Sequence, residues 1–302
     1  MGTETKKTAA APQKSAPRKY KKQSGVAQVW RRLLKNKSSV MGLAFLVVLV
    51  LVTICANLLI DPELVTKQDY AIRNLPPSAE HWFGTDIYGR DILARVIYGA
   101  RVSLTIGVVT VIVSTGIGAL LGAIAAYYGG FIDEAIMRVC DVLVAVPETL
   151  LAMCVVTAMG ANATSLITAL VIAVVPNRCR LVRSTVLGVA GREYVEAAKA
   201  AGMKNLRIIL TQIMPNSMGP VIVVSMQGVA NMMLTAAGLS YLGVGIQPPT
   251  PEWGAMLSEA KGHMRENAYL VLFPGLAIFV TVLAVNMIGD GLRDALDPKL
   301  KR

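Results

Sequence analysis

The sequence predicts an all-α membrane protein with six transmembrane helices and with both termini in the cytoplasm. Of its 302 residues, 54% are hydrophobic and only 16% are charged, and the mean hydropathy is +0.54. A soluble domain carries roughly 25% charged residues, so this chain has too little charge to cover a globular surface in water. Long uncharged stretches give the number of spans, and the basic residues between them give their direction. A soluble enzyme, a disordered chain and a collagen-like fibre are thereby excluded.

The first 37 residues are expected to form a basic, disordered cytoplasmic tail. Residues 1–38 hold eleven Lys and Arg residues against a single acidic residue, Glu4, so this segment supplies +10 of the net charge of +11. A basic segment ahead of an apolar run sets the orientation of a membrane protein. The basic residues are not interleaved with aromatic residues and form no recognition motif, so nucleic-acid binding is not expected.

Residues 38–60 predict the first span. They are 23 uncharged residues between Lys37 and Asp61, and as a helix they would reach roughly 34 Å at ~1.5 Å per residue. This length is sufficient for a hydrocarbon core of ~30 Å. Residues 61–101 are mixed in charge and contain turn-forming residues, and we expect them outside the cell.

The next uncharged run, residues 102–132, predicts the second span. It contains Gly118 and Gly122, which form a small-xxx-small pair. Such a pair lets two helix backbones approach closely in lipid. Packing within one subunit is its expected role.

The third and fourth spans are inferred from charge and direction together. Residues 149–177 are uncharged but too short for two spans and a turn. Residues 178–207 are strongly basic, and basic loops stay in the cytoplasm, so two spans that turn near 160–164 are required. The third span then carries Asp141 and Glu148 into or near the membrane, where an ionised carboxylate must face protein or water.

The fifth and sixth spans complete a predicted five-helix core at residues 102–291. Residues 208–251 are uncharged and favour a span at about 217–243, and residues 267–289 supply the last span. Residues 292–302 are expected to form a cytoplasmic C-terminal tail. Three arginines are expected to mark the cytoplasmic end of the fourth span: Arg178, Arg180 and Arg183.

The sequence holds no motif for nucleotide hydrolysis or metal binding. GxxxxGK[ST] and HExxH do not occur, and the four cysteines lack metal-ligand spacing. We therefore expect that this chain is not an enzyme and carries no cofactor.

The cytoplasmic loop at residues 184–215 carries the strongest mechanistic signal. Residues 193–201 are strong helix formers and include four alanines. Gly202 suits the left-handed turn that ends a helix, and a second helix is expected from about Lys204. The small alanine side chains, with Glu196 at their rim, suit insertion into the groove of a partner. An ordinary amphipathic loop at the bilayer surface is the alternative.

Four segments of the chain point to one family when they are taken together. They are Glu196-Ala197-Ala198-x-x-x-Gly202 with IMPN at 213–216, HWFGTDIYGRD at 81–91, LSYLGVGIQPPTPEWG at 239–254, and FPG at 273–275 with GDGLRDALDP at 289–298. The first resembles the EAA loop of ABC importer membrane subunits. Jointly the segments resemble the second, C-type permease of the dipeptide, oligopeptide and nickel importers. The resemblance covers about residues 30–298.

The resemblance implies the type I ABC importer permease fold, in a multi-pass protein of the bacterial cytoplasmic (inner) membrane, surrounded by lipid. It implies one half of an ATP-driven translocation pathway for peptides. The implied partners are a second homologous permease in a heterodimer, two cytoplasmic ATP-binding subunits that hydrolyse ATP, and an external substrate-binding protein. In this family the EAA loop forms a coupling helix seated in an ATPase subunit. The expected docking residues are therefore Glu196, Ala197, Ala198 and Gly202.

Three polar residues of the predicted spans are candidates for the translocation path, namely Asp141, Glu148 and Asn231. Charged peptides need polar cavity walls, whereas hydrogen bonding between helices is the alternative role. Residues 248–254 are expected to form a rigid external turn, with Trp253 as an interfacial anchor.

Other functions are compatible with parts of the same pattern. Nickel chelates and related solutes share this permease family. An ATPase-independent secondary transporter would show internal inverted repeats and a midplane site of broken helices, and the sequence shows neither. A structural or signalling scaffold would have no transport path. The secondary transporter and the scaffold both predict activity or stability without an ATPase partner.

Overall fold

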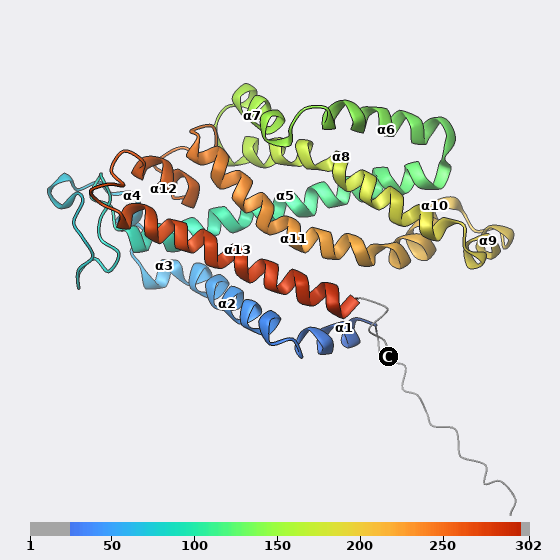
Figure 1. Cartoon of the computed structure of the whole chain (residues 1–302), viewed down its shortest axis with the longest axis horizontal. Helices are drawn as coiled ribbons and strands as arrows, with labels where there is room; N and C mark the ends of the chain where they lie inside the picture. Colours follow the sequence, from blue (N-terminus) through green and yellow to red (C-terminus); the bar gives the residue numbers. More distant parts are fainter. Residues whose placement is uncertain (1–24, 297–302) are drawn as a thin grey trace, which may run out of the picture.

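The computed structural model describes residues 25–296, which form a bundle of long helices (Figure 1). No strand is formed in this range, where the one β-type pairing is an isolated bridge between Thr85 and Asp91. Most of the predicted N-terminal tail, residues 1–24, and the end of the predicted C-terminal tail, residues 297–302, lie outside the described residues. The predicted all-α class is confirmed.

Helix α1 (Gly25–Leu33) precedes the first long helix, α2 (Lys37–Ile54). The prediction of a disordered tail is therefore wrong for the stretch that α1 occupies, where Leu33 is only 5% exposed. α2 begins at an Asn36 cap, whose side-chain oxygen accepts hydrogen bonds from the backbone N–H groups of Ser38 and Ser39. Such a cap satisfies N–H groups that have no partner within the helix.

Within residues 25–296, five helical stretches are long and apolar enough to cross a membrane. They are α2, α5 (Ile92–Tyr128), α8 (Ala163–Ala190), Asn205–Tyr241, which includes α11 (Met214–Tyr241), and α13 (Tyr269–Leu296). The helices α6 (Gly130–Val144) and α7 (Glu148–Met159) are bent by 85° where they join, and together they make a sixth span if the pair is a broken span and not a re-entrant loop. Six spans were predicted, and the residues of the predicted third span form two short helices with a sharp bend between them.

The break between α6 and α7 follows from the local sequence. Pro147 has no backbone N–H and disfavours helical geometry in the residue before it. α6 accordingly ends with Ala145 as its cap, Pro147 adopts a ψ of 134°, and a new helix starts at Glu148. Glu148 therefore lies in the first turn of a helix and beside a break in the span.

α5 begins at Ile92, ahead of the start predicted at residue 102. The prediction relied on uncharged runs, whereas the first turns of α5 carry arginines whose charge is satisfied by the protein. The guanidinium of Arg101, for example, donates to the backbone carbonyl groups of Thr53 and Ile54 near the end of α2. A charged side chain that is hydrogen-bonded by the protein in this way can lie within a long helix.

α5 and α8 form the most extensively packed pair of helices. Gly118 and Gly122 lie where the two helices meet. A Cβ atom added at Gly118 would lie 2.5 Å from Cβ of Arg178, and one at Gly122 would lie 2.5 Å from the carbonyl oxygen of Cys179. The predicted role of this small-residue pair in packing within one subunit is confirmed.

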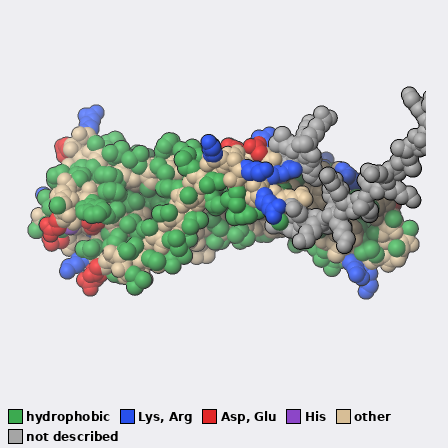
Figure 2. Space-filling view, turned by 90° about the horizontal axis from the view of Figure 1, so that it is seen from below, with side chains coloured by type: hydrophobic (Ala, Val, Ile, Leu, Met, Phe, Trp, Pro, Cys, Tyr) green, Lys and Arg blue, Asp and Glu red, His purple; other side chains and the backbone are tan. Residues whose placement is uncertain are grey.

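The outer surface of the bundle is apolar along its middle. Figure 2 shows a broad hydrophobic band on the face that includes α2, with charged side chains at the left end of the view and again in its right half. Val48 of α2 and Phe279 of α13 are 58% and 62% exposed. Exposed apolar side chains along a span suit contact with lipid tails.

The two ends of the bundle carry different structures (Figure 1). One end carries α9 (Glu193–Ala200) and α10 (Asn205–Ile208), which continues through a π-helical turn, η2 (Ile209–Ile213), into α11. The other end carries the remaining short elements, which are α3 (Ala56–Leu59), α4 (Glu63–Thr66), η1 (Tyr70–Ile72) and α12 (Trp253–Ala260). We call residues 193–208 the α9 hairpin, and residues 61–95 together with α12 the α12 cap.

Trp253 is buried within the α12 cap and does not anchor an interface. It is 1% exposed, and its indole N–H donates to the carbonyl oxygen of Val96 on α5 at 2.9 Å. Gly254 permits this approach, since a Cβ atom there would lie 2.3 Å from the carbonyl oxygen of Ala237. The prediction of an interfacial anchor is therefore wrong, because the turn folds back onto the helices and removes the indole from the surface.

Candidate functional site

The α9 hairpin has the turn that its sequence predicts. Gly202 adopts a φ of +76°, in the left-handed region, and its N–H donates to the carbonyl oxygen of Lys199 at 3.0 Å. The N–H of Met203 donates to the carbonyl oxygen of Ala198 at 3.2 Å. These two hydrogen bonds form a Schellman motif, in which glycine avoids the steric cost of a Cβ atom. The hairpin is thus a short helix with a defined end.

Three of the four predicted docking residues lie on the surface of the hairpin. Glu196, Ala197 and Gly202 are exposed. Ala198 is only 9% exposed and belongs to a buried cluster with Val195. Ala198 therefore faces its own chain, and the surface that a partner can reach is formed by its neighbours.

The base of the hairpin is fixed to the bundle by apolar contacts. Val195, Ile208 and Ile213 are fully buried, and they pack in one cluster with side chains of α5, α8 and α11. The hydroxyl group of Tyr127, near the end of α5, also donates to Oδ1 of Asn205 at 2.9 Å. The base of the hairpin is therefore in direct contact with three long helices.

A cavity of about 320 Å³, lined by both polar and apolar side chains, lies among α7, α8 and α11. Two of the predicted path residues, Glu148 and Asn231, line it. The prediction missed three further polar side chains of its wall, which are Asn177, Arg178 and Gln227. We call it the Arg178 cavity.

Asp141 does not line this cavity and does not lie with Glu148. Its carboxylate pairs with Arg180 of α8, and both side chains are about half exposed. Asp133, also on α6, accepts two hydrogen bonds from Arg183 of α8. These pairs join α6 to α8, and the break at Pro147 separates Asp141 from the cavity.

Arg178 lies within the bundle instead of marking the cytoplasmic end of a span. It is 7% exposed, and its Nη1 donates to the carbonyl oxygen of Val224 on α11 at 3.2 Å. The sequence prediction treated every arginine of this region as a boundary. Space for Arg178 comes from glycines on two other helices, and no local sequence pattern reports that space.

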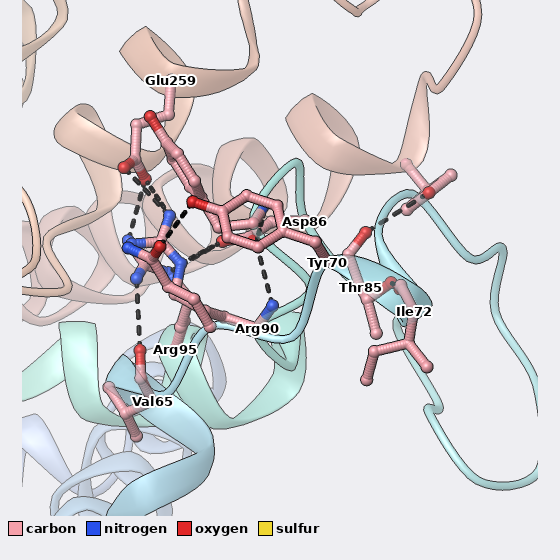
Figure 3. Close-up of polar contacts among 11 residues, drawn as sticks. Val65, Tyr70, Ile72, Thr85, Asp86, Arg90, Arg95 and Glu259 are labelled. Atoms are coloured by element: carbon pink, nitrogen blue, oxygen red, sulfur yellow. Dashed lines mark hydrogen bonds and ion pairs between the residues drawn. The ribbon is translucent and has the colours of Figure 1, made fainter.

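The α12 cap is held by a buried ionic cluster (Figure 3). Nη2 of Arg90 lies 2.9 Å from both carboxylate oxygens of Glu259, and its Nε lies 2.6 Å from Asp86. Arg95 of α5 donates to Glu259 at 2.9 Å and to the carbonyl oxygen of Val65 at 3.2 Å. Both guanidinium groups are 1% exposed. The cluster joins the segment after α2, the start of α5 and α12.

This arrangement defines a fold class, that of the membrane subunit of a type I ABC importer. The chain superposes on the MetNI methionine ABC transporter in an inward-facing crystal form with a TM-score of 0.57, at 16% identity over 68% of this chain and 98% of that one. A second inward-facing crystal form gives a TM-score of 0.55, at 15% identity over 67% of this chain and 96% of that one. At these identities the likeness shows the fold alone.

Sequence comparison then places the chain within that class. Residues 118–302 match the family described as binding-protein-dependent transport system inner membrane component, and the chain belongs to this family. Residues 25–77 match the N-terminal transmembrane domain of oligopeptide transport permease C. The chain is therefore a permease subunit of an ABC importer and a multi-pass protein of the inner membrane.

Two relatives illustrate the range of the family. The dipeptide transport system permease protein DppC of Alkalihalophilus pseudofirmus is 43% identical over 309 residues, which cover 100% of both chains. The glutathione transport system permease protein GsiD of Pectobacterium atrosepticum is 43% identical over 274 residues, which cover 91% of each chain. The expected resemblance to peptide-type permeases is confirmed.

Proposed function

We propose that this chain forms half of the translocation pathway of an importer for dipeptides or oligopeptides. A second homologous permease supplies the other half in a heterodimer. Two cytoplasmic ATP-binding subunits hydrolyse ATP, and an external binding protein delivers the peptide. The two relatives described above support this cargo, since one is named for dipeptides and the other for glutathione, which is itself a small peptide.

The α9 hairpin supports the proposal that this chain is coupled to the ATP-binding subunits. It lies at one end of the bundle, it exposes Glu196 and Ala197, and its buried side rests on α5, α8 and α11. At Ala197 the helix can approach the wall of a groove closely, because a methyl side chain adds little bulk between the two surfaces. We infer that this exposed face seats in an ATP-binding subunit.

Purification of the complex and transport in vesicles together test the proposal. The chain is expected to co-purify with a second permease and ATP-binding subunits, and reconstituted vesicles are expected to accumulate a radiolabelled dipeptide only with ATP and the binding protein. Accumulation of a nickel chelate in place of the peptide would favour the alternative cargo. Peptide accumulation by the isolated chain would contradict the ATP-driven mechanism and indicate a secondary transporter.

A bulky substitution tests the docking face separately. Ala197→Trp is expected to reduce the amount of ATP-binding subunit that co-purifies at least about tenfold, because an indole no longer fits the groove. Ala161→Trp is the matched control, since Ala161 is exposed in the loop between α7 and α8, far from the hairpin in sequence. Equal co-purification of both variants would contradict docking through this face.

A further inference from the structure

Arg178 occupies a slot built from two glycines on different helices. A Cβ atom at Gly228 of α11 would lie 2.1 Å from Nη2 of Arg178, and one at Gly118 of α5 would lie 2.5 Å from its Cβ. A side chain at either glycine would therefore displace the arginine. The bundle is shaped to hold a long cationic side chain at this position.

The hydrogen-bonding capacity of this guanidinium is not used up by the chain. Nη1 has its bond to Val224, whereas Nε is buried and has no hydrogen-bond partner. Within residues 25–296, Arg178 forms no ion pair, in contrast to Arg180 and Arg183, which each pair with a carboxylate of α6. A buried cation without a paired anion is costly. An anion that enters the cavity would reduce this cost.

A carboxylate lines the same cavity and forms no ion pair with Arg178. Glu148 lines the wall at the start of α7, beside the helix break, and its charge attracts that of Arg178. Asn177, Gln227 and Asn231 line the remaining polar wall. Amide groups both donate and accept hydrogen bonds, as peptide bonds do. The volume of about 320 Å³ lies at the lower end of the ~300–1,000 Å³ typical of sites for small ligands.

We propose that the Arg178 cavity is a transient binding site for a zwitterionic solute. The guanidinium of Arg178 binds the carboxylate of the solute, and the carboxylate of Glu148 binds its ammonium group. A small peptide with free termini carries both of these charges. Arginine suits this task because its planar group binds a carboxylate through two parallel hydrogen bonds. This inference rests on the proposed importer function and adds the chemical group that the cavity recognises.

A purely structural role for Arg178 makes a different prediction. In that role Arg178 only ties α8 to α11 through the carbonyl group of Val224. Its loss would then slow the transport of every cargo by the same factor. Comparison of two cargoes that differ only at the carboxylate separates the two roles.

Uptake of alanyl-alanine and of its C-terminal amide by the reconstituted complex provides this comparison. Arg178→Gln is expected to lower uptake of the acid roughly 10- to 100-fold, the range for loss of a charged hydrogen bond. Uptake of the amide should change less than about threefold. The ratio of acid to amide is compared between the variant and the wild type, so any preference of the binding protein cancels. An equal loss for both cargoes, or no loss for either, would overturn the proposal.

Two further variants control for charge and for folding. Arg180→Gln removes the same charge two residues away, from a side chain paired with Asp141 outside the cavity. It is expected to leave the ratio of acid to amide at the wild-type value, and an equal shift in that ratio would contradict a specific site. Arg178→Lys keeps the charge but not the planar fork, and it is expected to retain an intermediate ratio.

A binding measurement tests the site without transport. Val224 lines the cavity and is 37% exposed, so Val224→Cys, in the assembled complex with the four native cysteines replaced, reports access through its reaction with N-ethylmaleimide. Alanyl-alanine is expected to slow labelling at least about threefold, the amide to have little effect, and Arg178→Gln to abolish protection by the acid. Equal protection by acid and amide would overturn the carboxylate site, even where ATP-driven uptake is intact. Selective protection by the acid without any ATP-driven uptake would support the site and contradict the proposed importer function.

Discussion

The structures at the two ends of the bundle are held in place by different kinds of interaction. The α12 cap has a buried ionic cluster in which Arg90 and Arg95 share Glu259. The α9 hairpin has a base of aliphatic side chains, and its exposed side carries charged residues together with small ones such as Ala197 and Gly202. A buried ionic cluster tolerates little movement, because each charge needs its partner in place. Aliphatic contacts have no such directional requirement. We therefore expect the α12 cap to be rigid and the α9 hairpin to tolerate displacement by a partner subunit.

Loss of one partner in the α12 cap is expected to have the largest effect. Glu259→Gln would leave two buried guanidinium groups without their shared carboxylate, and removal of one partner of a buried pair costs about 3–5 kcal/mol. Thermal unfolding in detergent should show a large fall in the midpoint. Glu266→Gln is the matched control, since Glu266 is exposed in the same region. Similar midpoints for the two variants would show that the ionic cluster does not hold the cap.

A methyl group between α5 and α8 tests whether the helices between the two ends form a rigid body. Gly122→Ala would place its Cβ atom 2.5 Å from the carbonyl oxygen of Cys179, and overpacking of this kind costs about 1–3 kcal/mol. Gly116→Ala is the control on the same helix, where no atom lies within 4 Å of the added Cβ. Chemical denaturation of both variants measures the difference. Equal stability would mean that the two helices separate easily.

The turn of the α9 hairpin offers a smaller and more local effect. Gly202→Ala is expected to cost about 1–2 kcal/mol, because L-residues are strained in the left-handed region, where Gly202 has a φ of +76°. Hydrogen exchange at the backbone amides of α9 should accelerate roughly tenfold, while amides of the α12 cap keep their rates. Gly188→Ala in α8 is the control, since Gly188 is helical and no atom lies within 4 Å of an added Cβ. Acceleration at both ends would contradict their independence.

The exposed pair between α6 and α8 should give the smallest effect. Asp141→Asn breaks an ion pair whose side chains are 50% and 41% exposed, and such pairs contribute about 0–1 kcal/mol. The unfolding midpoint is expected to shift little, and less than that of Asp133→Asn, which breaks a pair that is only 19% and 32% exposed. A larger shift for Asp141→Asn would assign the pair a role beyond joining the two helices.

Sequence reasoning predicted the features that depend on neighbouring residues. The spans follow from runs of apolar residues, and the end of α9 follows from a glycine after an alanine-rich stretch. The ionic cluster was missed because Glu259 and Arg90 are 169 positions apart, and no local pattern relates them. Arg178 was misplaced for a similar reason, since the space for it comes from Gly118 and Gly228. A charged residue in the sequence marks the end of a membrane span only where no distant part of the protein provides space or a partner for its side chain.

The position of Pro176 in α8 determines how Arg178 is connected to the α9 hairpin. α8 runs without another proline from Arg178 to Ala190, where it meets α9, and this segment spans roughly 18 Å at ~1.5 Å per residue. Pro176 therefore lies on the side of Arg178 away from the hairpin, and a proline is a position where helices commonly bend. A displacement of α9 would reach the guanidinium of Arg178 through one uninterrupted segment of α8. Binding of the solute at Arg178 and displacement of the α9 hairpin by the ATP-binding subunit would then be coupled directly through α8.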